Sequence, residues 1–146
     1  MHANFLRPAF AASALSTLLL TGVPAFAEMV SYKADLKASS EVPPNDSKGT
    51  GAVDASYDTT SKKFSWTITY SGLTGPATAA HFHGPAAANA NAPPVVPLSG
   101  NLASPIKGDA TLTDAQATDL QAGRWYFNVH TDANKGGELR GQVVKK

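Results

Sequence analysis

Three histidines in the chain have a spacing that suits a shared metal site. His81 and His83 are two residues apart in a strand-like segment, so their side chains project from one face with Cα atoms about 6.5–7 Å apart. His130 ends the segment 124–130, in which alternate positions are apolar, and it falls on the polar side of that alternation. All three imidazoles are therefore expected to point away from the apolar face, as they must if they are to meet.

Neutral imidazoles bind copper, zinc, iron and nickel, and three of them leave a coordination position open. One hypothesis is a transition metal, with copper as the first choice, at His81, His83 and His130. Asp132 follows two residues after His130 and is a further candidate, as a fourth ligand or as a partner that orients a ligand. The alternative is structural, with the three histidines donating hydrogen bonds to loop backbone and holding the irregular segment 84–97 in place. The His-x-His pattern does not by itself decide between the two.

The segments that must position these histidines have the patterns of short β-strands. In residues 63–70, Phe64, Trp66, Ile68 and Tyr70 alternate with serine and threonine, which is typical of a half-buried strand. Weaker strands are bounded by glycine, proline, asparagine or aspartate. Seven strands at this spacing predict an all-β, Greek-key or immunoglobulin-like β-sandwich. The expected strands are 30–37, 50–57, 63–70, 78–83, 106–112, 124–130 and 139–144.

One short helix and one long loop interrupt the strands. The run Thr113-Asp114-Ala115-Gln116 has the Thr-x-x-Gln pattern of a capping box, which predicts a helix of about two turns ending near Gly123. The segment 84–97 holds four prolines and no periodicity, so we expect a loop there.

Composition restricts the function classes. The chain has 146 residues, a formal net charge of +1 and no cysteine. This length accommodates one ordinary domain. Disulfides, thiolate nucleophiles and cysteine-ligated metals are excluded. Twelve lysines and arginines against eleven acidic residues give no basic excess, so nucleic acid is not an expected partner.

The first 27 residues have the features of a secretory signal peptide. Arg7 supplies a positive start, residues 9–20 are largely apolar, and Ala25-Phe26-Ala27 is an A-x-A cleavage signal. A membrane anchor is the alternative, but a span needs about 18 apolar residues and this run is shorter. We therefore expect residues 28–146 to form an exported domain, periplasmic or secreted, with no membrane span after cleavage. Cleavage would remove Arg7, one of the twelve basic residues, and the remaining domain would have no formal net charge, because the chain has eleven acidic residues.

Sequence motifs of catalysis are missing. The chain has no Gly-x-Ser-x-Gly elbow, no phosphate-binding glycine loop and no His-Glu-x-x-His helix. We therefore expect a binding or structural protein rather than an enzyme.

Eight motifs follow one another across nearly all of residues 28–146, namely 38–44 (ASSEVPP), 49–51 (GTG), 72–73 (GL), 80–86 (AHFHGPA), 112–113 (LT), 120–123 (LQAG), 125–131 (WYFNVHT) and 136–142 (GGELRGQ). In this order they resemble the CHRD domain, a module named from chordin. The resemblance implies an immunoglobulin-like or related β-sandwich, usually without assigned catalysis, and the family's motif histidines correspond to His81, His83 and His130. Growth-factor antagonism does not carry over, because the cysteine-rich modules of chordin are missing.

A looser similarity connects the chain with the copper/zinc superoxide dismutase sandwich, which also carries a His-x-His strand and a late histidine. The bridging histidine, further zinc ligands and cysteine pair of that family have no counterparts here. Three functions remain open. They are a non-catalytic CHRD binding module with a copper site, a copper-dependent redox protein, and an envelope adhesion or interaction module that binds an unknown protein partner without metal.

Overall fold

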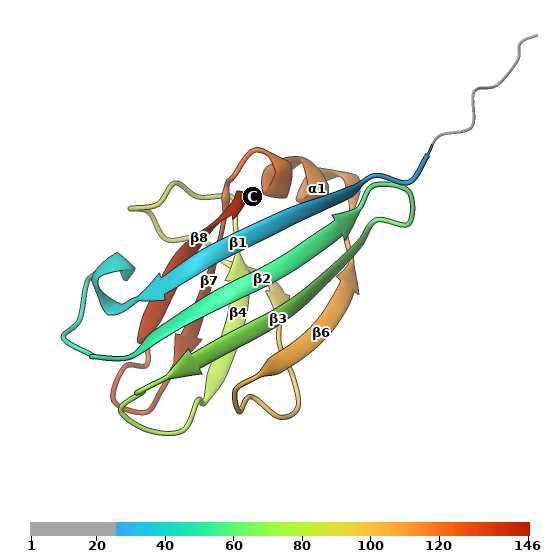
Figure 1. The fold of residues 1–146 in the computed structure, drawn as a ribbon. Helices are drawn as coiled ribbons and strands as arrows, with labels where there is room; N and C mark the ends of the chain where they lie inside the picture. The colour runs from blue at the N-terminus through green and yellow to red at the C-terminus, as the bar shows by residue number, and fades with distance from the viewer. Residues whose placement is uncertain (1–25) are drawn as a thin grey trace, which may run out of the picture.

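Eight antiparallel strands and one short helix make up the part of the chain that the structure, a computed structural model, describes, which is residues 26–146 (Figure 1). The strands form one sheet in the order β5-β4-β7-β8-β1-β2-β3-β6. The elements are β1 (Met29–Lys37), η1 (Ala38–Ser40), β2 (Thr50–Asp58), β3 (Lys63–Ser71), β4 (Ala79–His83), β5 (Pro94–Pro97), β6 (Ile106–Thr111), α1 (Asp114–Gln121), β7 (Trp125–His130) and β8 (Leu139–Lys145).

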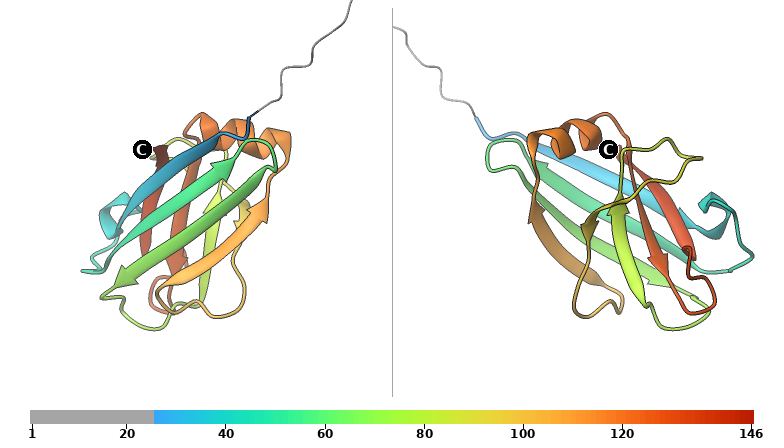
Figure 2. Two further views of the ribbon diagram at one scale, coloured as in Figure 1. Left: turned by 45° about the vertical axis from the view of Figure 1, so that its right-hand side comes forward. Right: turned by 180° about the vertical axis from the view of Figure 1, so that it is seen from behind.

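The sheet curves until it is nearly closed. In Figure 2, β1, β2, β3 and β6 form one layer, and β8, β7, β4 and β5 form the other, with α1 at one end. Strands β8 and β1 pair along one side and join the two layers, whereas β5 and β6 end the sheet on the other side. The expected all-β sandwich with one short helix is confirmed.

Strand β5 is the main departure from the sequence prediction. All seven expected strands are present, but the segment 84–97 also contributes an eighth, which pairs with β4 through Phe82 and Val96. Burial of Val96 explains the pairing, because this side chain is only 8% exposed. Prolines at both ends of β5 are tolerated because the strand lies at the edge of the sheet, where it needs only one partner.

Aromatic side chains fill the space between the layers. Phe64 of β3 lies at the centre, with its ring 5.2–6.4 Å from those of Tyr32, Trp66, Phe82 and Trp125. Three of these four contacts are edge-to-face, the arrangement that the ring quadrupole favours. The apolar residues that alternate with polar ones along β3 are therefore those that face this core, and the polar residues between them face the outside of the sheet.

Helix α1 begins as the sequence predicts. The Thr113 side chain accepts a hydrogen bond from the Gln116 backbone, and the Gln116 side chain accepts one from the Thr113 backbone. Both halves of the capping box are therefore formed. Within the described residues, no helix is both long enough and apolar enough to cross a membrane. The predicted signal peptide, residues 1–27, falls almost entirely outside these residues.

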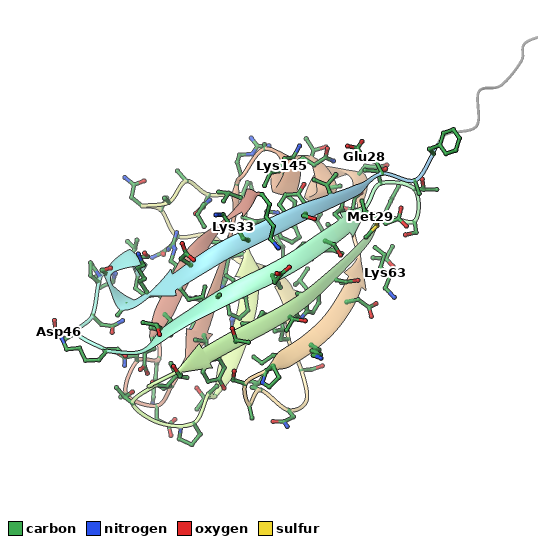
Figure 3. The ribbon with its side chains drawn as sticks, viewed as in Figure 1. Glu28, Met29, Lys33, Asp46, Lys63 and Lys145 are labelled. Atoms are coloured by element: carbon green, nitrogen blue, oxygen red, sulfur yellow. The ribbon has the colours of Figure 1, made fainter. Side chains whose placement is uncertain are left out.

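The outer faces of the two layers differ. Strands β1 and β3 present side chains such as Lys33 and Lys63 to solvent (Figure 3). The outer face of β4, β7 and β8 also carries polar side chains, but the segments 41–47 and 84–93 lie over it, through contacts such as Asn45 with Glu138 and Arg140 with Ala90. As a result, polar residues are buried there, namely Glu41, His83, Asn128 and Arg140.

Candidate metal centre

The three predicted histidines meet on the covered outer face. His81 and His83 project from β4, and His130 projects from the neighbouring end of β7, where Ala79 is its partner in the register. One nitrogen from each ring lies within 4.8 Å of the others. The closest pair is Nδ1 of His81 and Nε2 of His130, at 3.1 Å. The sequence argument that all three imidazoles share a face is confirmed.

Backbone carbonyls fix the orientation of two of the rings. Nδ1 of His83 is 2.8 Å from the carbonyl oxygen of Ala92, and Nδ1 of His130 is 2.9 Å from that of Lys135. A carbonyl oxygen only accepts hydrogen bonds, so both Nδ1 atoms carry the proton. In a neutral ring the Nε2 atom then carries a lone pair, and in both residues this atom faces the cluster. The two predicted roles are therefore compatible, because His83 and His130 hydrogen-bond loop backbone through Nδ1 while their Nε2 atoms belong to the cluster.

The surroundings favour the neutral form of the rings. Burial lowers the pKa of His81, and the nearby His130 and His83 lower it further. Burial also lowers the pKa of His83, although its hydrogen bonds with Ala92 and Asn128 oppose the shift. Neutral imidazoles are the form that binds metal ions.

Stacked planar groups hold His83 in place. The Tyr126 ring lies parallel to the His83 ring, with centroids 4.7 Å apart, and the Arg140 guanidinium lies 3.5 Å from the centre of the Tyr126 ring on β7. Arg140 in turn donates hydrogen bonds to the Asn91 side chain and the Ala90 carbonyl, at 2.8 and 2.6 Å. These contacts tie the segment 84–93 to the sheet and fix one wall of the histidine cluster.

Asn128 is a site residue that the sequence analysis did not single out. Its Oδ1 atom lies 2.9 Å from Nε2 of His83 and 3.0 Å from Nε2 of His130. A signal was available, because Asn128 lies two residues before His130 on the same strand face, and the register places it beside His81. The predicted extra ligand Asp132, by contrast, is exposed and lies outside the cluster.

A buried carboxyl lies behind Asn128. Glu41 is 4% exposed, and its Oε1 atom is buried without a hydrogen-bond partner among the described residues. Burial raises the pKa of Glu41 to about 7, although the charge of Arg140 and a hydrogen bond with Asn128 act in the opposite direction. The chain therefore places three imidazoles, one amide and one carboxyl in contiguous positions on this face.

Comparison with known families agrees with the sequence resemblance. The CHRD domain model matches residues 32–143, which run from within β1 to within β8 and include all three histidines. The chain belongs to the CHRD domain family. Comparisons of this CHRD protein with curated proteins and with solved structures find no significant match.

Proposed function

We propose that this CHRD protein is an exported, non-catalytic binding module that holds one copper ion between His81, His83 and His130. The direction of the ring nitrogens carries the proposal. His83 and His130 use their Nδ1 protons on backbone carbonyls, so their Nε2 lone pairs face one another, His81 and the oxygen of Asn128. Acceptor atoms in contact repel one another unless a proton or a cation lies between them, and a metal ion satisfies all of them at once.

The spacing also suits a metal ion. Tetrahedral bonds of about 2.0–2.1 Å place ligand nitrogens about 3.3 Å apart. Nδ1 of His81 and Nε2 of His130 are already 3.1 Å apart, and no pair in the cluster exceeds 4.8 Å. Side-chain movements of at most about 1.5 Å would therefore complete the coordination.

Copper is the proposed metal because the donors are imidazoles and the chain has no cysteine. For nitrogen ligands, divalent copper binds most tightly among the first-row metals. Zinc is the reference ion, because it accepts the same ligands without redox chemistry. Export is supported by the leader-like sequence of residues 1–27.

The test separates metal binding from loop bracing. His81→Ala removes one ligand, and Nδ1 of His81 lies 3.1 Å from Nε2 of His130 rather than beside a loop carbonyl. We expect wild-type protein to bind one Cu(II) or Zn(II) in a calorimetric titration at pH 7.5. We expect His81→Ala to weaken binding by at least about 100-fold, because the loss of a residue that only orients a ligand already weakens metal affinity by up to about 100-fold. Asp132→Asn is the matched control and should change the affinity less than about threefold, because a residue outside the coordination sphere falls below that range.

Equal affinity in wild type and His81→Ala would contradict the proposal, and the histidines would then be loop braces. Copper-loaded protein should also show no superoxide turnover above that of the metal-free protein. Turnover would instead favour a copper-dependent redox enzyme.

A further inference from the structure

We infer that Asn128 supplies a fourth ligand atom through Oδ1, that Glu41 is the positioning residue for this amide, and that the site consequently prefers a divalent ion to monovalent copper. This inference rests on the proposed metal site and specifies which ions it takes.

Asn128 lies where a fourth donor belongs. Its Oδ1 atom contacts the Nε2 atoms of both His83 and His130, at 2.9 and 3.0 Å. These distances resemble the separations between ligand atoms that share one metal ion, about 3.3 Å in a tetrahedral site. The residue is 3% exposed, so water does not compete for this position. An ion bound between the three histidines would therefore meet the amide oxygen as well.

Glu41 determines which end of the amide faces the histidines. The Asn128 amide directs Oδ1 at the imidazoles and Nδ2 toward the Glu41 carboxyl, because Nδ2 of Asn128 and Oε1 of Glu41 both lie beside Gly137. A hydrogen bond in which the amide NH₂ group donates to this carboxyl lowers the pKa of Glu41. Gly137 keeps this pair enclosed. A Cβ atom at residue 137 would lie 2.2 Å from Oε1 of Glu41 and 2.7 Å from Nδ2 of Asn128, so only glycine lets the β7–β8 turn close over them.

The oxygen donor changes the choice of ion. Monovalent copper prefers soft sulfur ligands, whereas amide oxygens suit harder divalent ions. Three imidazoles alone accept both oxidation states. The addition of Oδ1 stabilises Cu(II) and Zn(II) and contributes little to a soft monovalent ion, for which Ag(I) is a redox-inert probe.

The first experiment removes the oxygen. Asn128→Leu keeps the approximate shape of the side chain and leaves the three histidines. We expect its affinity for Cu(II) and Zn(II) to fall about 10- to 100-fold, the range for partners of metal ligands, while its affinity for Ag(I) stays within about threefold. A general loss of structure would lower both affinities together, so the ratio of divalent to monovalent affinity separates coordination from folding.

The second experiment tests positioning through Glu41. Glu41→Leu removes the acceptor for the amide NH₂ group, and we expect it to lower divalent affinity about tenfold. Glu41→Gln retains a side-chain oxygen that accepts the same hydrogen bond, so it should restore most of the loss. Leucine and glutamine are both uncharged and of similar size, so a difference in divalent affinity between the two variants would come from the hydrogen-bonding oxygen.

The outcomes distinguish the two proposals. If wild-type protein binds none of the three ions, the metal site and this inference both fail. If wild-type protein binds Cu(II) and Asn128→Leu binds it equally well, the metal site stands and the inference is overturned. A parallel loss of Ag(I) affinity in Asn128→Leu, or failure of Glu41→Gln to exceed Glu41→Leu, would also overturn it.

Discussion

Replacement of Glu138 by glutamine tests how the loops near the histidines are held. The Glu138 side chain is fully buried, and its carboxylate accepts hydrogen bonds from the hydroxyls of Ser47, Thr74 and Thr131, the Thr74 backbone and the Asn134 amide. Burial alone would raise the pKa of Glu138, but the hydrogen bonds from Ser47, Thr131 and Thr74 lower it to about 2. The carboxylate therefore joins three loops that are distant in sequence.

The expected loss follows from that pKa. A fall from the ordinary value of 4.5 to about 2 corresponds to about 3 kcal/mol of stability. Glutamine keeps one acceptor oxygen, but in either orientation its NH₂ group faces a donor, which is the backbone N–H of Thr74 at the Oε1 position or the Asn134 amide at the Oε2 position. Hydrogen bonds to a charged group contribute about 1.5–3 kcal/mol each. The loss of one such bond therefore agrees in size with the loss of stability derived from the pKa.

The pH dependence gives the sharper test. Because the folded-state pKa of Glu138 is lowered, its contribution is complete above about pH 4.5 and is lost as the pH falls toward 2. Urea unfolding, followed by fluorescence of the buried tryptophans, should show Glu138→Gln less stable by about 3 kcal/mol at pH 6. The difference should shrink as the pH falls. An exposed control, Asp132→Asn, should show no such trend. A difference that is independent of pH, or below about 1 kcal/mol, would refute this reasoning.

Four further outcomes are expected. Gly108→Ala would place a Cβ atom 2.8 Å from the Trp66 ring and should cost about 1–3 kcal/mol in urea unfolding. Thr113→Ala removes the capping box of α1, so thermal unfolding should show a loss of about 1 kcal/mol. Arg140→Leu removes donors to the segment 84–93, and hydrogen exchange of its backbone amides should become faster while exchange in β2 stays unchanged. Cu(II) affinity should fall between pH 7.5 and 5.5 in calorimetry, because protons compete for the ring nitrogens.

Most of the fold is predictable from the sequence because the information that specifies it is local. The alternation around Phe64 and the Thr113 capping box depend on neighbours in the chain, and both elements form as expected. Strand β5 escapes prediction because a four-residue edge strand with proline at each end has no periodicity of its own. Its pairing depends on the contact of Val96 with β4, which is a tertiary effect.

The candidate site is predictable only in part for the same reason. The alternation of side chains along a strand is enough to place His81, His83 and His130 on one face. The ring orientations, however, depend on carbonyls in two loops, and the role of Asn128 depends on burial of Glu41 from a remote segment. No local pattern encodes these long-range contacts.

Nitrogen-15 NMR of the histidine side chains tests the central claim most directly. Before metal is added, His83 and His130 should both show a protonated Nδ1 and an unprotonated Nε2 at pH 7.5. One equivalent of Zn(II) should then shift Nε2 of both residues and Nδ1 of His81 together, with no further change at two equivalents. Protonated Nε2 atoms in the metal-free protein, or ring nitrogens that do not respond to one equivalent, would contradict the account.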